Sequence, residues 1–123
     1  MTYARQALGL EGETLACLAL EAAGYRIVQR RYRTRFGELD IVARHEHSIV
    51  FVEVKARRGG AFGDPAAAVT AQKQRRLVMM AADYLARYGV ARTTVRFDVV
   101  AVRLVRGQAP EVTVIPDAFR PGW

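Results

Sequence analysis

Several features are scarce in this sequence of 123 residues, and each absence narrows the classes of protein to consider. A single cysteine, Cys17, allows neither an internal disulfide nor a cysteine-ligated metal cluster. No apolar run approaches the roughly 20 residues that a membrane-spanning helix needs. The first residues also lack the apolar segment of a signal peptide. We therefore expect a soluble cytoplasmic protein with no membrane association.

Acidic residues and lysines are few compared with arginines. Lys and Arg total 19 against 12 Asp and Glu, which gives a net charge of +7, and only Lys55 and Lys73 are lysines. The planar arginine guanidinium matches pairs of phosphate oxygens, so an arginine-rich surface suits a nucleic-acid backbone. A high-GC coding bias would produce the same excess without any such role. Charge alone therefore leaves nucleic-acid binding open.

The chain is long enough for one domain with a modest core, and 51% hydrophobic residues argue against disorder. Helices are predicted over 2–23, ending at Gly24, and over 70–88, with Thr70 as N-cap and Gly89 as the stop. Five segments have the pattern of strands: 25–33, 38–44, 49–55, 94–104 and 111–115.

Glycines and prolines predict a loop over 56–65 and an irregular tail over 116–123. The resulting order is helix, three strands that begin as an antiparallel meander, a crossover helix, and further strands. This order predicts a single α/β domain over residues 1–123, with a mixed sheet flanked by helices.

The stretch 37–55 contains two strands separated by the polar segment 45–48. Side chains alternate between the two faces of a strand, so pairing the strands as a hairpin fixes which residues meet. One register gives a wholly apolar face, in which the facing pairs are Leu39 and Val54, Ile41 and Val52, and Ala43 and Val50. On the other face, this register puts Asp40 opposite Glu53 and Glu38 opposite Lys55.

The pairing of Asp40 with Glu53 requires an explanation. Like charges that face each other on a sheet repel, and a buried unpaired carboxylate is costly. A divalent cation between the two would resolve the repulsion, and magnesium prefers one or two carboxylates together with water. Compensation by Lys55 and nearby arginines would resolve it as well. The pattern alone leaves both explanations open.

Asp40, followed after twelve residues by Glu53-Val54-Lys55, resembles the core of the PD-(D/E)xK nucleases. The segments GELDIVA and FVEVKAR, with Phe62-Gly63-x-Pro65, Lys73 and Arg96-Phe97-Asp98-Val99-Val100, resemble the small bacterial YraN-like family over roughly Gly9 to Val102. That family is similar in fold to archaeal Holliday-junction resolvases. The resemblance therefore implies a restriction endonuclease-like core in the order αβββαβ.

The same resemblance implies a Mg²⁺- or Mn²⁺-dependent endonuclease acting on DNA, including branched or recombination and repair intermediates. Asp40, Glu53 and the carbonyl of Val54 would hold the metal, and Lys55 would position or deprotonate the attacking water. Glu13 matches a first-helix glutamate that supports the metal site in resolvase-like relatives, whereas a simple amphipathic helix would keep Glu13 at its solvent edge. Two-fold dimers are usual among junction-cleaving relatives, so a homodimer is one expectation.

Basic residues around this stretch are expected to follow the nucleic-acid backbone. The densest basic segment, 25–36, also contains aromatic residues that would stack on bases or pack within the sheet. The first turns of the second helix are basic although cations oppose the helix dipole there, which indicates either an anionic partner or a solvated basic turn. Arg31 stands where the family often has an asparagine. The predicted contacts are Arg31, Arg33, Arg35, Arg57, Arg58, Lys73 and Arg76.

His45 and His47 have the spacing of a metal pair but fall in a turn, so we expect solvated side chains. Asp98 is an acid in an apolar strand, and an arginine such as Arg96 is favoured over a metal as its partner. The alternative function is a non-catalytic nucleic-acid-binding or adaptor module, in which Lys55 and the arginines balance a relic carboxylate pair.

Overall fold

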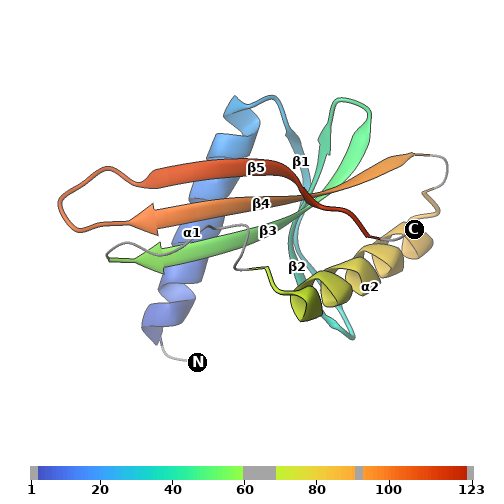
Figure 1. Ribbon diagram of the computed structural model, residues 1–123, viewed down its shortest axis with the longest axis horizontal. Helices are drawn as coiled ribbons and strands as arrows, with labels where there is room; N and C mark the ends of the chain where they lie inside the picture. The colour runs from blue at the N-terminus through green and yellow to red at the C-terminus, as the bar shows by residue number, and fades with distance from the viewer. Residues whose placement is uncertain (1–2, 60–68, 91–92, 122–123) are drawn as a thin grey trace.

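The computed structural model describes residues 3–59, 69–90 and 93–121, which form a five-stranded sheet between two helices (Figure 1). The elements in chain order are α1 (Tyr3–Ala22), β1 (Arg26–Thr34), β2 (Gly37–His45), β3 (Ser48–Arg58), α2 (Ala71–Arg87), β4 (Thr94–Leu104) and β5 (Glu111–Phe119). The strands lie side by side in chain order, and only β3 and β4 are parallel. This arrangement confirms the predicted α/β class with a mixed sheet flanked by helices.

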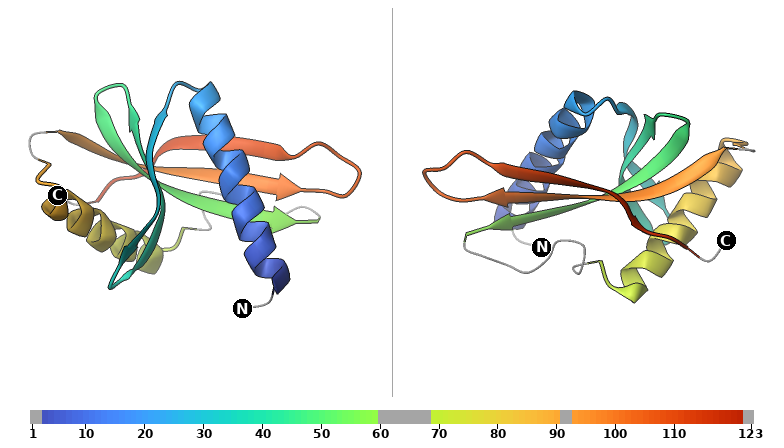
Figure 2. Two further views of the ribbon diagram at one scale, coloured as in Figure 1. Left: turned by 180° about the vertical axis from the view of Figure 1, so that it is seen from behind. Right: turned by 45° about the horizontal axis from the view of Figure 1, so that its top comes forward.

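The two helices cover opposite faces of the sheet, as the two views of Figure 2 show. One core lies between α2 and the sheet, and includes Tyr32, Leu39, Phe51, Leu77 and Phe97. The other lies between α1 and the sheet, and includes Ala16, Leu20, Ile41, Val50 and Val100. None of the helices in the described ranges is long and apolar enough to cross a membrane.

The predicted ends of the helices agree with the structure. Gly24 has a φ of +91°, in the left-handed region that lets glycine end a helix. At the start of α2 the Thr70 hydroxyl accepts a hydrogen bond from the Lys73 N–H, as expected of an N-cap. Gly89, with a φ of +61°, follows α2 and its C-cap Tyr88.

Two segments predicted as irregular belong to strands. Residues 56–58 continue β3, because its parallel pairing with β4 runs on to Arg58 opposite Leu104. The rest of the predicted loop, 60–65, lies outside the described residues. The tail prediction was also wrong over 116–119, where β5 continues after a register shift. There the N–H of Asp117 bonds to the Asp98 carboxylate at 3.0 Å, and the Phe119 ring stacks on Phe97.

The predicted register of the β2–β3 hairpin is confirmed for Ile41 with Val52 and Ala43 with Val50. The ladder ends at Ile41–Val52, so the predicted pairs of Leu39 with Val54, Asp40 with Glu53 and Glu38 with Lys55 are not part of it. The strands extend further than predicted, to the pair His45–Ser48. Only two residues then remain for the turn, and Glu46 adopts a left-handed φ of 55°.

Leu39 does not lie on the face predicted for it. Ile41 packs in the α1-side core, but Leu39 packs in the α2-side core with Tyr32. The regular alternation of β1 and β2 is interrupted beside Leu39, where Arg31 has a φ of 53° between the pairs Arg30–Ile41 and Tyr32–Leu39. A left-handed residue turns the following side chain away from its extended direction, so Tyr32 and Leu39 face α2 together.

Candidate functional site

The ladder between β2 and β3 ends at the predicted acidic pair. After the pair Ile41–Val52, the Asp40 carboxylate accepts the hydrogen bond of the Val54 N–H, with 2.8 Å between Oδ2 and N. The N–H and C=O of one residue in an extended strand point to the same side. The Val54 carbonyl therefore points to the same side as its N–H, toward Asp40. A carboxylate oxygen and a backbone carbonyl oxygen thus lie near each other where β2 and β3 separate.

Asp40 and Glu53 are incompletely compensated acids. Burial raises the pKa of Asp40 to about 7, with the negative charge of Glu53 as the next cause, while the Val54 N–H acts in the opposite direction. Burial also raises the pKa of Glu53, and the cations of Lys73, Lys55 and Arg76 oppose this shift. The two carboxylates are thus both buried, and the charge of Glu53 further disfavours the ionised form of Asp40.

Lys55 has a lower pKa than an ordinary lysine, so its ammonium group loses a proton more readily. Its pKa is lowered to about 8. Burial is the largest cause, and a hydrogen bond to Lys73 and the positive charges of Lys73 and Arg57 lower the pKa further. Lys73 belongs to the first turn of α2, whereas Lys55 is in β3. The basic N-terminus of α2 is therefore part of the same electrostatic site as the acidic pair.

Two cavities open onto the acidic pair, one on each side of the sheet. The cavity beside α1 has a volume of about 870 Å³, and the smaller one beside α2 has about 230 Å³. Glu38, Asp40 and Glu53 line both cavities, so the carboxylates are accessible from two directions.

The cavities also collect most of the predicted basic residues. The α1-side cavity is lined by Arg31, Arg33, Arg57 and Arg58, and the α2-side cavity by Lys73 and Arg76. Arg35 lines neither cavity, and its guanidinium lies over the Phe36 ring at 4.9 Å. Arg35 is therefore the predicted contact that the structure does not bring to the acidic pair.

Glu13 is buried beside the larger cavity rather than at a solvent edge, with 7% of its surface exposed. Helix α1 reaches β3 closely because residue 12 is glycine: a Cβ there would lie 2.6 Å from the Ala56 Cβ. One Glu13 oxygen, Oε1, accepts from Nε of Arg30 at 2.8 Å and from Nε of Arg31 at 3.1 Å.

The acids available for a metal are few. Among the residues that the structure describes, no three His, Cys, Asp or Glu side chains gather closely enough to hold an ion. A cation at this site would therefore rest on Asp40, Glu53 and backbone or water oxygens. Carboxylate and carbonyl oxygens are the donors that Mg²⁺ and Mn²⁺ prefer.

Sequence reasoning missed two residues at or beside the site. Glu38, expected to face Lys55, lines both cavities and has Arg33 as its ion-pair partner, with 3.4 Å between Oε2 and Nη2. Arg30 was not singled out, yet it shares Glu13 with Arg31. The alternation of β2 gave a signal for Glu38, which is two residues from Asp40, but the sequence contains no signal for a contact between Arg30 and α1.

The predicted partner of Asp98 is confirmed, and one of the two histidines belongs to the same cluster. Arg96 donates to both Asp98 oxygens at 2.9 Å. The prediction that His45 is solvated was wrong, because its ring stacks on Tyr25 at 3.9 Å and Nδ1 lies 2.9 Å from the Arg96 guanidinium. His47, in contrast, is exposed in the turn.

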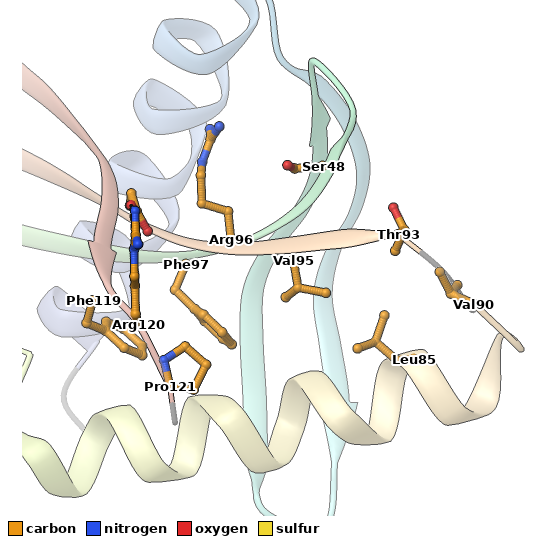
Figure 3. Close-up of a pocket in the computed structure, with 11 residues that line it drawn as sticks. Ser48, Leu85, Val90, Thr93, Val95, Arg96, Phe97, Phe119, Arg120 and Pro121 are labelled. Atoms are coloured by element: carbon orange, nitrogen blue, oxygen red, sulfur yellow. Dashed lines mark hydrogen bonds and ion pairs between the residues drawn. The ribbon is translucent and has the colours of Figure 1, made fainter. Parts of the chain in front are cut away.

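A third cavity, of about 550 Å³, lies near the start of β4 and has a different character (Figure 3). In Figure 3, Val95 and Phe97 point from β4 toward α2, while Arg96 points to the other face of the sheet. Its two arginines are engaged by acids, Arg96 by Asp98 and Arg120 by Asp117. Among its described lining residues Asp117 is the one acid, so this cavity lacks a facing pair such as Asp40 and Glu53.

Comparison with known proteins gives a consistent assignment. The model of uncharacterised protein family UPF0102 matches residues 12–102, a range that contains Glu13, Asp40, Glu53 and Lys55. A UPF0102 protein of Syntrophotalea carbinolica is 49% identical over 124 residues, covering 100% of both chains. A UPF0102 protein of Rhodococcus jostii is 47% identical over 113 residues, covering 92% of this chain and 96% of the relative. The resemblance to the YraN-like family is thereby confirmed, and the chain belongs to protein family UPF0102.

Proposed function

We propose that the protein is a metal-dependent endonuclease that hydrolyses phosphodiester bonds of DNA. The observation that carries this proposal is the juxtaposition of Asp40 and Glu53 at the point where β2 and β3 separate, with Lys55 two residues beyond Glu53. A carboxyl with its pKa raised to about 7 and an amine with its pKa lowered to about 8 exchange protons near neutral pH. Perturbed groups of this kind that line a cavity are typical of active sites.

The oxygen donors of this site fit a divalent cation. Asp40, Glu53 and the Val54 carbonyl would hold Mg²⁺ or Mn²⁺, because a cation there would offset the burial of both carboxylates and the repulsion that Glu53 exerts on Asp40. Such an ion would polarise the scissile phosphodiester and lower the pKa of the attacking water. The residues that surround the pair would then supply proton transfer and substrate binding.

Lys55 is the residue proposed to take the proton of the attacking water. Its burial and the charge of Lys73 keep a substantial share of the amine neutral near pH 8, and only the neutral amine accepts a proton. The proton that Lys55 accepts is returned to solvent through the open α1-side cavity. Lys73 thus has a second role besides binding the backbone, since its charge keeps Lys55 ready to act.

The basic walls of the two cavities are proposed to bind the phosphates on either side of the scissile one. Arg33, Arg57 and Arg58 stand on the α1 side and Lys73 and Arg76 on the α2 side. The order α1-β1-β2-β3-α2-β4 agrees with the restriction endonuclease-like core that the resemblance implies. The same resemblance extends the proposal to branched recombination or repair intermediates and to a homodimer.

Cleavage of a labelled panel tests the proposal: duplex, single strand, flap and four-way junction DNA with Mn²⁺. Lys55→Ala is expected to lower the cleavage rate by about 10²-fold or more while DNA binding persists, because it removes a proton acceptor. Arg35→Ala is the matched control, since Arg35 is a nearby cation that lines neither cavity. Equal cleavage by wild type and Lys55→Ala, or undiminished cleavage with EDTA, would contradict the proposal.

A non-catalytic DNA-binding or adaptor module is the second candidate. The observation that favours it is the presence of Lys73, Lys55 and Arg76 around Glu53, because these cations oppose the rise in its pKa without any metal. This candidate predicts that wild type and Lys55→Ala bind DNA and that neither cleaves any member of the panel. The same experiment therefore separates the two candidates.

A further inference from the structure

Arg30 and Arg31 reach the same carboxylate from adjacent positions of one strand. Neighbouring side chains in an extended strand point to opposite faces, so only one of the two should reach α1. Both do, because Arg31 has a φ of 53° and leaves the extended conformation. An arginine rarely adopts this conformation, and such departures often mark functional positions.

The two arginines use Glu13 differently. Arg30 sends Nε to Glu13 and Nη2 toward the Thr14 hydroxyl at 3.4 Å, and it does not line the α1-side cavity. Arg31 sends only Nε to Glu13. Within the described part of the chain, neither of its Nη atoms has a bonded acceptor. Arg31 lines the cavity that contains Asp40 and Glu53, and 46% of its side chain is exposed.

We propose that Glu13 is a positioning residue that directs the Arg31 guanidinium toward a phosphate of the nucleic-acid strand in this cavity. A guanidinium held through Nε keeps both Nη groups for two parallel hydrogen bonds to phosphate oxygens. The trio of Arg30, Arg31 and Glu13 retains a net positive charge, which favours an anion. This inference rests on the proposed nucleic-acid substrate, and it gives Glu13 a role other than supporting a metal.

The ion pairs themselves argue for positioning over metal support. Oε1 of Glu13 already accepts two charged donors, at 2.8 and 3.1 Å. Both guanidiniums hold Oε1 at a site with 7% exposure, so Glu13 has only Oε2 left for a cation. In this inference Glu13 acts on the substrate through Arg31.

The test measures binding of a fluorescent single-stranded DNA oligonucleotide by anisotropy, in EDTA and over a range of salt concentrations. Arg31→Ala is expected to weaken binding about tenfold and to reduce the salt slope by about one, because one phosphate contact is lost. Arg30→Ala is the matched control, since it removes an equal charge from the same carboxylate outside the cavity. We expect Arg30→Ala to weaken binding by less than about threefold.

Glu13→Gln gives the sharper result, because the two explanations predict opposite signs. Removing a negative charge near the site strengthens DNA binding if charge alone matters, whereas loss of positioning weakens it. We expect weaker binding by Glu13→Gln, and no further weakening when it is combined with Arg31→Ala. Melting temperature and circular dichroism check that each variant is folded.

The possible results distinguish this inference from the nuclease proposal. Tighter binding by Glu13→Gln, or equal losses in Arg30→Ala and Arg31→Ala, would overturn the positioning role even if the protein cleaves DNA. The expected pattern without any cleavage would uphold the positioning role and overturn the nuclease. Absence of DNA binding by the wild type would overturn both.

Discussion

Two acidic sites on the same sheet differ in how completely their charges are satisfied. Asp98 is 1% exposed and accepts four hydrogen bonds, from the Tyr25 hydroxyl, twice from Arg96 and from the Asp117 N–H. Asp40 accepts a hydrogen bond from the Val54 N–H, and the negative charge of Glu53 lies close to it.

A saturated carboxylate supports the fold, because every donor around it depends on its charge. An unsaturated pair reduces stability unless a ligand completes it, and such pairs are typical of binding and catalytic sites. Removing the negative charge should therefore lower the free energy of unfolding at Asp98 and raise it at Asp40, and both changes can be measured.

The largest effect is expected at Asp98. Asp98→Ala removes the acceptor of Arg96 and Tyr25 in the protein interior, and breaking a buried ion pair from one side costs about 3 to 5 kcal/mol. Urea denaturation measures the loss in the free energy of unfolding. Glu111→Ala is the control, because Glu111 is a half-exposed acid paired with Arg103 on the same two strands, and such pairs contribute about 0 to 1 kcal/mol. A loss at Asp98 no greater than at Glu111 would remove the distinction.

The opposite sign is expected at Asp40 when no divalent metal is present. Its folded pKa of about 7 lies above the ordinary value of 3.8, so the folded protein binds more protons than the unfolded chain between these values. The contribution of Asp40 to stability is thus greatest below about pH 4 and is lost as the pH rises through 7. Asp40→Asn has no such loss and keeps an acceptor for the Val54 N–H.

We therefore expect Asp40→Asn to unfold at a higher temperature than wild type at pH 8 in EDTA, by about 5 °C, which corresponds to roughly 1 to 2 kcal/mol. The difference should shrink as the pH falls toward 3, because Asp40 is then protonated in both the folded and the unfolded state. Melting curves at several pH values measure both trends. A variant less stable than wild type at pH 8 would show that Asp40 is satisfied after all, like Asp98.

Much of this difference could be anticipated from the sequence, because it follows from alternation along single strands. The apolar pattern predicted the hairpin register as far as the pair Ile41–Val52, which leaves Asp40 and Glu53 next to the end of the ladder. The apolar surroundings of Asp98 likewise indicated that it needs a partner. The strand 94–104 and the N-cap Thr70 were predicted for the same reason: the signals are local.

The parts that could not be predicted depend on contacts between distant segments or on unusual backbone conformations. The left-handed Arg31 leaves no trace in the hydrophobic pattern, so the face of Leu39 was assigned wrongly. The link between Lys55 and Lys73 crosses from a strand to a helix, and the stacking of His45 on Tyr25 joins β2 to the segment after α1. Such contacts depend on tertiary packing, and the hydrophobic pattern along the chain carries no information about them.

The smallest effect, and the one closest to function, is the response to a divalent cation. Mg²⁺ or Mn²⁺ that binds the folded protein raises its free energy of unfolding by RT ln(1 + [L]/Kd). This gain is about 1.4 kcal/mol when the free ion concentration is ten times Kd. We expect the melting temperature of wild type at pH 8 to rise by about 4 °C, because the ion replaces the repulsion between Asp40 and Glu53 with attraction.

Asp40→Asn should show little of this gain, whereas Arg35→Ala should show all of it, since Arg35 lies outside both cavities. The cation would then narrow the stability difference between wild type and Asp40→Asn that EDTA reveals. An equal rise in wild type and Asp40→Asn would mean that the ion binds elsewhere. The acidic pair would then be balanced by Lys55, Lys73 and Arg76 alone, which is the condition of the non-catalytic module.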